Sequence, residues 1–168
     1  MQVKDTALAY LAGMIDGDGY VSIVRSVRKG VEYFAPQVGI SGTLSAPHDL
    51  AASIWGGKVT RYVPTNPSHR PQFQWSRQGA VALQVLESIY PYLLLKQEHA
   101  LLAMELHELV VESRQEDPFP WFGPYYDPIH DMRRMREEMI GMNQSRNRIR
   151  KKTAGRTLDG VTHDEFPA

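Results

Sequence analysis

The chain has 168 residues, 42% of them hydrophobic, and its 19 basic and 19 acidic side chains leave no net charge. This size predicts one domain with a real core over residues 1–155, followed by a weakly ordered tail at residues 156–168. The absence of cysteine excludes disulfides and thiolate metal sites. No apolar run is long enough to cross a membrane, and the N-terminus shows no signal sequence. We therefore expect an intracellular protein without a membrane partner, in a compartment that the sequence does not identify.

Charge is distributed very unevenly along the second half of the chain. Residues 133–156 are strongly basic, whereas residues 105–131 are strongly acidic. Such runs usually form solvated surface, but this basic run also contains asparagine, glutamine and serine, which suit contacts with bases and phosphates. A local positive potential attracts a polyanion even when the whole molecule is neutral. The pattern favours a nucleic-acid partner.

Apolar spacing predicts a mixed α/β fold (α+β) in which helices alternate with two β-hairpins. A first helix begins at Asp5 or Thr6 and places Leu8, Leu11 and Ile15 on one face. Period-two alternation predicts the strands, and glycine, proline and polar clusters mark the turns. The further elements expected in chain order are strands at 20–28 and 31–43, a helix at 50–55, strands at 58–63 and 72–77, helices at 79–89, 96–113 and 129–142, and a basic loop at 143–153.

The first helix also carries small residues four positions apart, namely Ala9, Gly13 and Gly17. Small residues at this spacing let two helix backbones approach each other closely. Because the sequence contains this segment once, the partner helix is expected to come from a second copy of the chain. The sequence therefore predicts a homodimer with Ala9, Ala12 and Gly13 at its interface.

The end of this helix is chemically unusual. Gly17 and Gly19 are helix-stopping residues, with Asp18 between them and Asp16 two positions earlier. Carboxylates at a helix C-terminus face exposed carbonyls and the negative end of the helix dipole, which costs stability. A divalent cation relieves this repulsion, because Mg²⁺ accepts carboxylates, carbonyls and waters together. The plain alternative is a helix that ends in a polar Asp-Gly turn.

One face of the predicted sheet is polar. Such a face is usually only the solvated side of an antiparallel sheet. Glutamine side chains, however, bond base edges, and lysine and arginine suit guanine or phosphate, so we predict a DNA-binding surface. Its predicted members are Ser22, Val24, Ser26, Arg28, Gln37, Ser41, Thr43, Lys58, Thr60, Tyr62, Gln72, Gln74 and Ser76.

The nonapeptide at residues 11–19, Leu-Ala-Gly-Met-Ile-Asp-Gly-Asp-Gly, resembles the signature of the LAGLIDADG homing endonucleases. The predicted element order is similar to their α-β-β-α-β-β-α-α fold, in which a curved antiparallel sheet lies in the DNA major groove. Residues 90–97 resemble a segment of the single-motif, homodimeric, intron-encoded members that ends in a catalytic-pocket lysine, here Lys96. Residues 143–153 resemble their C-terminal DNA-binding loop, which adds Ser145, Arg146, Arg148, Arg150, Lys151, Lys152 and Thr153 as expected DNA-binding residues.

The resemblance implies a site-specific endonuclease that makes a double-strand break in a long pseudo-palindromic target of double-stranded DNA. It implies that Asp18 is catalytic and binds the metal together with the carbonyl of Gly17. It also implies that Asp16 helps to structure the helix pair, which adds Asp16 to the expected dimer interface. Lys96 would be the second catalytic residue, and the cofactor would be Mg²⁺ or Mn²⁺.

One position departs from the family pattern. Leu44 stands where the family commonly has Gln or Asp to position a water. Either Thr43 or His48 supplies the missing polarity, or the active site is impaired. An intron RNA maturase and a catalytically silent DNA-binding protein are the alternative functions on the same fold.

Overall fold

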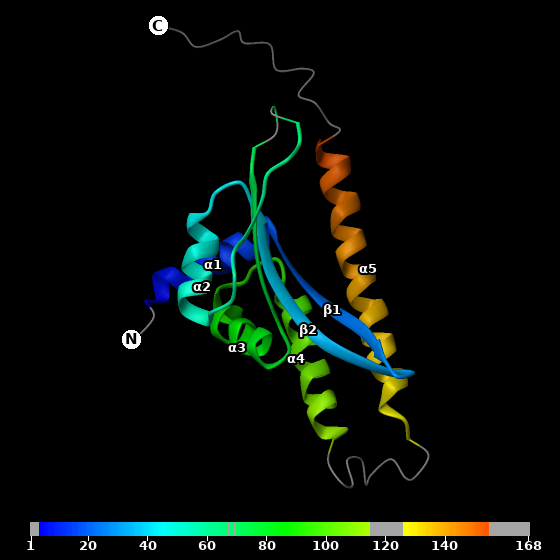
Figure 1. Cartoon of the computed structure of the whole chain (residues 1–168). Helices are drawn as coiled ribbons and strands as arrows, with labels where there is room; N and C mark the ends of the chain where they lie inside the picture. The colour runs from blue at the N-terminus through cyan, green and yellow to red at the C-terminus, as the bar shows by residue number, and fades with distance from the viewer. Residues whose placement is uncertain (1–3, 67, 69, 115–125, 155–168) are drawn as a thin grey trace, which may run out of the picture.

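The computed structural model of the chain describes residues 4–66, 68, 70–114 and 126–154 (Figure 1). Within these ranges the chain forms five α-helices, a four-stranded sheet and a short 3₁₀ helix, which confirms the predicted α+β class. In chain order the elements are α1 (Asp5–Gly17), β1 (Gly19–Arg28), β2 (Val31–Gly42), α2 (Ala46–Trp55), β3 (Thr60–Tyr62), β4 (Gln72–Gln78), α3 (Ala80–Ile89), η1 (Tyr90–Tyr92), α4 (Gln97–Glu112) and α5 (Pro128–Ala154).

The strands form one antiparallel sheet in the order β1-β2-β4-β3. Lys29 and Gly30, which join β1 to β2, both have positive φ, the conformation that a tight two-residue hairpin needs. β2 pairs with β1 along one edge and with β4 along the other. Lys58 lies ahead of β3, and Thr43 follows the end of β2, so these two strands are shorter than alternation predicts.

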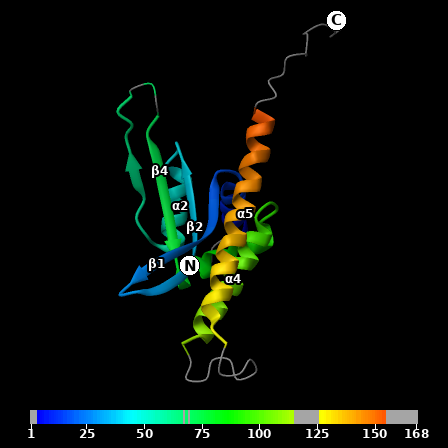
Figure 2. The same cartoon turned by 90° about the vertical axis from the view of Figure 1, so that its right-hand side faces the viewer.

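The helices cover one face of the sheet, and the core lies between them (Figure 2). Strand alternation produces this arrangement, because every second side chain points towards the helices. Full burial of one such apolar side chain contributes about 1.5–3 kcal/mol. The core contains Val21 and Ile23 from β1, Val38 and Ile40 from β2, Trp75 from β4, and Leu11, Ile15, Leu86 and Leu106 from the helices.

Helix α5 continues to Ala154, well beyond the end predicted for the last helix at Met142. The prediction of a loop at residues 143–153 is therefore wrong. This stretch contains neither proline nor glycine, and its arginine, lysine and glutamine residues are good helix formers. The tail predicted at residues 156–168 lies outside the described residues. Within the ranges that the structure describes, no helix combines the length and the apolar character needed to span a bilayer.

Candidate functional site

Helix α1 ends in an exposed turn that carries Asp18. The backbone N–H of Asp18 closes the last helical turn at 2.9 Å, and Gly17 and Asp18 are both exposed. β1 begins at the next residue, so the helix and the strand touch at Gly19. A Cβ atom on Gly19 would lie 2.6 Å from the Cα of Ile15 and 2.7 Å from the carbonyl oxygen of Gly39. Only glycine fits this contact, which fixes the place where Asp18 reaches the surface.

Asp16 points in the opposite direction, into the chain, and is 5% exposed. Its Oδ2 accepts backbone N–H groups from Leu94 at 2.7 Å and Leu95 at 3.1 Å. Its Oδ1 accepts the backbone N–H of Lys96 at 2.9 Å. A buried carboxylate is tolerated only when it is hydrogen-bonded, and these three amides meet that need. Asp16 therefore holds the segment that precedes α4 against the end of α1.

Lys96 binds back to the end of α1 through its side chain, which is buried; the residue is 4% exposed. Its Nζ donates to the carbonyl of Gly19 at 2.7 Å, to that of Asp16 at 3.1 Å and to that of Ile15. An ammonium group has three N–H donors, and these three carbonyls match that number. The positive charge also faces the negative end of the α1 dipole, where it is stabilising. We call these two side chains and their backbone partners the Asp16–Lys96 latch.

The latch changes the interpretation of Lys96. The resemblance implies a catalytic lysine, and the structure directs this ammonium at the backbone of α1 from a buried position. The group holds Asp18 in place through the helix end, which is a positioning role. A direct catalytic role for Lys96 stays a prediction.

The oxygen donors at the exposed end of α1 fit a hard divalent cation. Mg²⁺ usually takes one or two carboxylates and keeps several waters. Asp18 and the carbonyl of Gly17 supply one carboxylate and one carbonyl per chain. No group of three histidine, aspartate or glutamate side chains that could hold a metal is found in the described part of the chain.

The small-residue stripe of α1 faces outward. Ala9, Gly13 and Gly17 are exposed, and a Cβ atom on either glycine would meet nothing within 4 Å. Ala12 and Asp16, which were also predicted at the dimer interface, are buried in the chain's own core. They follow Leu8, Leu11 and Ile15 around the helix at helical spacing, which turns them inward. The stripe that remains available to a partner helix is the one formed by Ala9, Gly13 and Gly17.

The predicted DNA-binding residues of the strands share one face of the sheet. Residues paired across an antiparallel ladder point to the same side. Ser22 pairs with Gln37 and Ser41 pairs with Gln74, which also pairs with Thr60 on its other edge. We call this surface, opposite the helices, the outer sheet face. Its predicted members are Ser22, Val24, Ser26, Arg28, Gln37, Ser41, Thr60, Tyr62, Gln72, Gln74 and Ser76.

Sequence reasoning missed several polar members of the outer sheet face, including Tyr20, which pairs with Gly39. Tyr33 pairs with Ser26, and its ring lies 5.9 Å from the guanidinium carbon of Arg28, within reach of a cation–π contact. Gln78 pairs with Gln37. The alternation of β2 already contained the signal for Tyr33. Gln78 was missed because the strand was expected to end one residue earlier.

The position near Leu44 is less polar than the family pattern would have it. Leu44 itself is 70% exposed, so an apolar side chain faces solvent there. His48 is 1% exposed, donates from Nδ1 to the carbonyl of Leu44 at 2.8 Å, and lies with its ring 6.1 Å from that of Phe73. This histidine is part of the packing between α2 and the sheet. Of the two candidates for the missing polarity, only Thr43 is exposed.

The basic segment belongs to helix α5. The backbone is helical through Ala154 and Ser145 is exposed, while the side chains of Arg146, Arg148, Arg150, Lys151, Lys152 and Thr153 lie outside the described residues. Just before this segment, Asn143 Nδ2 donates to the carbonyl of Val21 at 3.1 Å. This bond attaches α5 to β1 two residues after Gly19. The basic segment therefore begins close to the end of α1 that carries Asp18.

Solved structures share this fold, although no protein-family model and no curated protein matches the sequence. I-CvuI, in complex with the I-CreI target in 2 mM Mg with the DNA not cleaved, is 17% identical, with 82% of each chain covered and a TM-score of 0.59. The archaeal intron-encoded I-Vdi141I complexed with DNA is 12% identical, with 96% of this chain and 90% of that chain covered and a TM-score of 0.61. The group I intron-encoded I-CeuI complexed with DNA is 14% identical, with 71% and 63% covered and a TM-score of 0.52.

These likenesses define the class of fold. The chain has an α+β fold with a one-sided antiparallel sheet, and that fold is the homing-endonuclease fold. The resemblance inferred from residues 11–19 is confirmed at this level.

Proposed function

We propose that the chain is a site-specific DNA endonuclease that acts as a homodimer and depends on a divalent metal. The observation that carries the proposal is the position of Asp18, an exposed carboxylate at a helix end that the buried Asp16–Lys96 latch holds in place. The latch fixes the helix end from which Asp18 reaches the surface. The fold supports the proposal, because solved proteins that share it are complexed with DNA.

The proposed dimer rests on the exposed small-residue stripe of α1. Ala9, Gly13 and Gly17 leave room for a second helix backbone at close range. A two-fold pair of α1 helices brings two copies of Asp18 together beneath the DNA. Two copies also give one cutting arrangement per strand, which suits a double-strand break in a long pseudo-palindromic target.

The roles of the residues follow from their exposure. Asp18 and the carbonyl of Gly17 would hold Mg²⁺ or Mn²⁺, which supplies Lewis acidity at the scissile phosphate when bound. Lys96 and Asp16 keep the helix end in register with β1. Exposed Thr43 is the polar group beside Leu44 that is available to orient water.

DNA recognition would divide between two surfaces. The outer sheet face presents glutamine, serine and threonine side chains that suit base edges in the major groove. The basic part of α5 supplies phosphate contacts, which position the duplex but carry little sequence information. We also propose that the protein acts inside the cell, because its proposed substrate is double-stranded DNA.

The test is cleavage of a DNA target selected from a randomised library, first by binding and then as an insert in supercoiled plasmid with Mg²⁺. Wild type should linearise the plasmid, and Asp18→Asn should bind the target without cutting it, because the carboxylate is lost and repulsion of phosphate is reduced. Asp49→Asn, the same change at an exposed position on α2, is the matched control and should cut. Cutting by Asp18→Asn at the wild-type rate would refute the active site.

The exposed Leu44 is the observation that would favour a catalytically silent DNA-binding protein. Specific binding by every variant with no cutting by any of them would support that second candidate and overturn the enzyme. Retention of intron RNA in place of DNA would support a maturase.

A further inference from the structure

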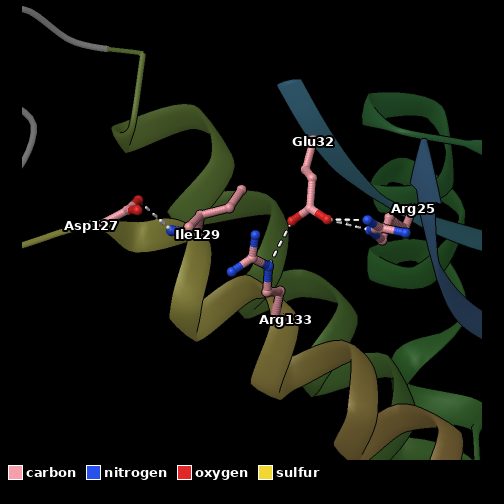
Figure 3. A network of polar contacts seen from close by, with 5 residues as sticks. All are labelled: Arg25, Glu32, Asp127, Ile129 and Arg133. Atoms are coloured by element: carbon pink, nitrogen blue, oxygen red, sulfur yellow. Dashed lines mark hydrogen bonds and ion pairs between the residues drawn. The ribbon is translucent and has the colours of Figure 1, made fainter. Parts of the chain in front are cut away.

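Three elements meet through one carboxylate at the far end of the first hairpin. Glu32 of β2 accepts from Nε of Arg25 in β1 at 2.6 Å through Oε1, and the same oxygen pairs with Nη2 of Arg25. Through Oε2 it accepts from Nε of Arg133 in α5 at 2.6 Å. Figure 3 shows the carboxylate between the two guanidinium groups. The Glu32 side chain is only 12% exposed, whereas both arginines are about half exposed. We call this arrangement the Glu32 bridge.

Within the described residues, the bridge and one further hydrogen bond are the directional contacts between α5 side chains and the strands. The helix otherwise rests on buried methionines, namely Met132, Met135 and Met139. Methionine packs adaptably and sets an angle poorly. The second directional contact is Asn143 to the carbonyl of Val21, at the opposite end of β1. Arg133 and Asn143 are ten residues apart, so the two contacts are separated by about 15 Å along the helix axis.

Beyond Asn143 the helix continues for eleven residues to Ala154, a further length of about 16 Å that contains the basic segment. The two arms on either side of Asn143 are therefore nearly equal in length. If the contact at Arg133 is lost, α5 can pivot about the remaining contact at Asn143. A lateral shift of the helix at Arg133 then moves its basic end by a similar distance in the opposite direction. The angle of α5 against the hairpin thus decides where the basic residues lie relative to the outer sheet face.

The negative charge of Glu32 should oppose DNA binding, so a merely structural role would leave its presence unexplained. Removing an acidic group from a polyanion-binding protein should by itself tighten DNA binding. Both arginine partners are about half exposed, and ion pairs with exposed partners contribute little to folding stability, so stability alone does not explain the group. Hydrogen bonds from Arg133 and then from Arg25 lower the pKa of Glu32 below its ordinary value of 4.5.

We infer that Glu32 is a positioning residue for DNA binding, which sets the angle between the outer sheet face and the basic end of α5. With the angle fixed, base contacts by the sheet and phosphate contacts by the helix engage the duplex in one register. This inference rests on the proposed function, since it assumes that both surfaces meet the same DNA.

The first experiment asks whether neutralising Glu32 weakens or tightens DNA binding. Glu32→Gln should weaken binding of the selected target and lower the salt slope by about one per chain, because one phosphate contact is lost. Glu137→Gln is the matched control. Glu137 of α5 and Glu32 of β2 line the same pocket of about 250 Å³, so the control removes the same charge from the same place. It should bind as tightly as wild type or more tightly. Equal or tighter binding by Glu32→Gln would overturn the inference.

A double-mutant cycle separates positioning from a general structural role. In a Lys151→Gln/Lys152→Gln background, Glu32→Gln should cause a much smaller further loss of affinity, because the group it positions is already removed. If the loss is the same in both backgrounds, Glu32 does not act through the basic end of α5 and the inference fails.

The second experiment measures the helix angle without DNA. Because the chain contains no cysteine, Ser26→Cys and Gln144→Cys introduce two unique spin-label sites, both exposed, on the hairpin and on α5. The distance distribution between the labels should be narrow in the otherwise wild-type chain and in Glu137→Gln, and broadened or shifted in Glu32→Gln. An unchanged distribution in Glu32→Gln would overturn the inference even if DNA binding is confirmed. A broadened distribution in a chain that binds no DNA would instead overturn the proposed function.

Discussion

The Asp16–Lys96 latch and the outer sheet face use polar side chains in opposite ways. In the latch both side chains are buried and bond to backbone groups 77 to 81 residues away in the sequence. On the outer sheet face the polar side chains are largely exposed, and their backbones are already satisfied by the ladders. The first arrangement fixes the geometry of a site, and the second leaves donors and acceptors for a ligand. Substitutions in the latch should therefore cost stability, and those on the face should change recognition.

The largest expected effect is on folding stability, from Asp16→Ala. The change leaves three backbone N–H groups without their acceptor and an ammonium in a buried position, at a cost of about 3–5 kcal/mol. Urea denaturation measures the loss. Asp18→Ala, two residues further on at the surface, is the control and should stay within about 0.5 kcal/mol of wild type. If the two variants are equally stable, the contrast between latch and surface is wrong.

The next effect compares two glycines of the same motif. Gly19→Ala drives a Cβ into the backbone of α1 and β2, so we expect a loss of about 2–3 kcal/mol. Gly13→Ala meets no atom of its own chain and should stabilise the isolated chain by up to about 1 kcal/mol through helix propensity. It should at the same time weaken the dimer, which sedimentation across a concentration series would detect. A tighter dimer from Gly13→Ala would count against pairing through α1.

On the outer sheet face, Gln74→Ala should leave the unfolding free energy nearly unchanged and alter base preference. Gln74 lies between Ser41 and Thr60 in the middle of the face. Loss of one bidentate contact to a base costs about 1–3 kcal/mol of discrimination, symmetrically in both half-sites of a dimer. Selection on randomised targets is the measurement. Unchanged preference would remove Gln74 from the reading surface.

The smallest effect is the pH dependence of the Glu32 bridge. Because the pKa of Glu32 is lowered in the folded chain, its contribution is complete above the ordinary value of 4.5 and is lost as the pH falls through the lower folded value. The charged groups around it are Arg25, Arg133, Arg136 and Glu137. The difference in Tm between wild type and Glu32→Gln should stay constant from pH 7 to pH 5 and shrink below pH 4.5. A difference that disappears between pH 7 and pH 5 would contradict the bridge.

Periodicity predicted the outer sheet face well, because a strand with one buried side has its alternation set by burial alone. The same reasoning on α1 should have turned Ala12 inward, since it adjoins Leu11 and Ile15 on the apolar stripe. The sequence carried no comparable sign of the latch. Lys96 and the end of α1 are about 80 residues apart in the sequence and meet only through the tertiary packing of the chain, which no local pattern encodes.

The extent of α5 was missed for a different reason. The composition of this basic, polar stretch and its resemblance to a DNA-binding loop both predict a loop. The residues themselves favour a helix, and neither glycine nor proline occurs between Gly141 and Gly155. His48 likewise looked available from its position after Leu44, but its ring is buried between α2 and Phe73.

The central claim is that the Asp16–Lys96 latch holds the end of α1 in place and that Asp18 is the catalytic metal ligand there. The most direct test measures unfolding free energy and plasmid cleavage together for Lys96→Met and Asp18→Asn. We expect Asp18→Asn to be as stable as wild type and inactive. Lys96→Met should lose about 2–3 kcal/mol, because buried carbonyls at the end of α1 lose their donor, and its cleavage should fall as the helix end loosens. An Asp18→Asn chain that cuts, or a Lys96→Met chain that keeps full stability, would contradict the account.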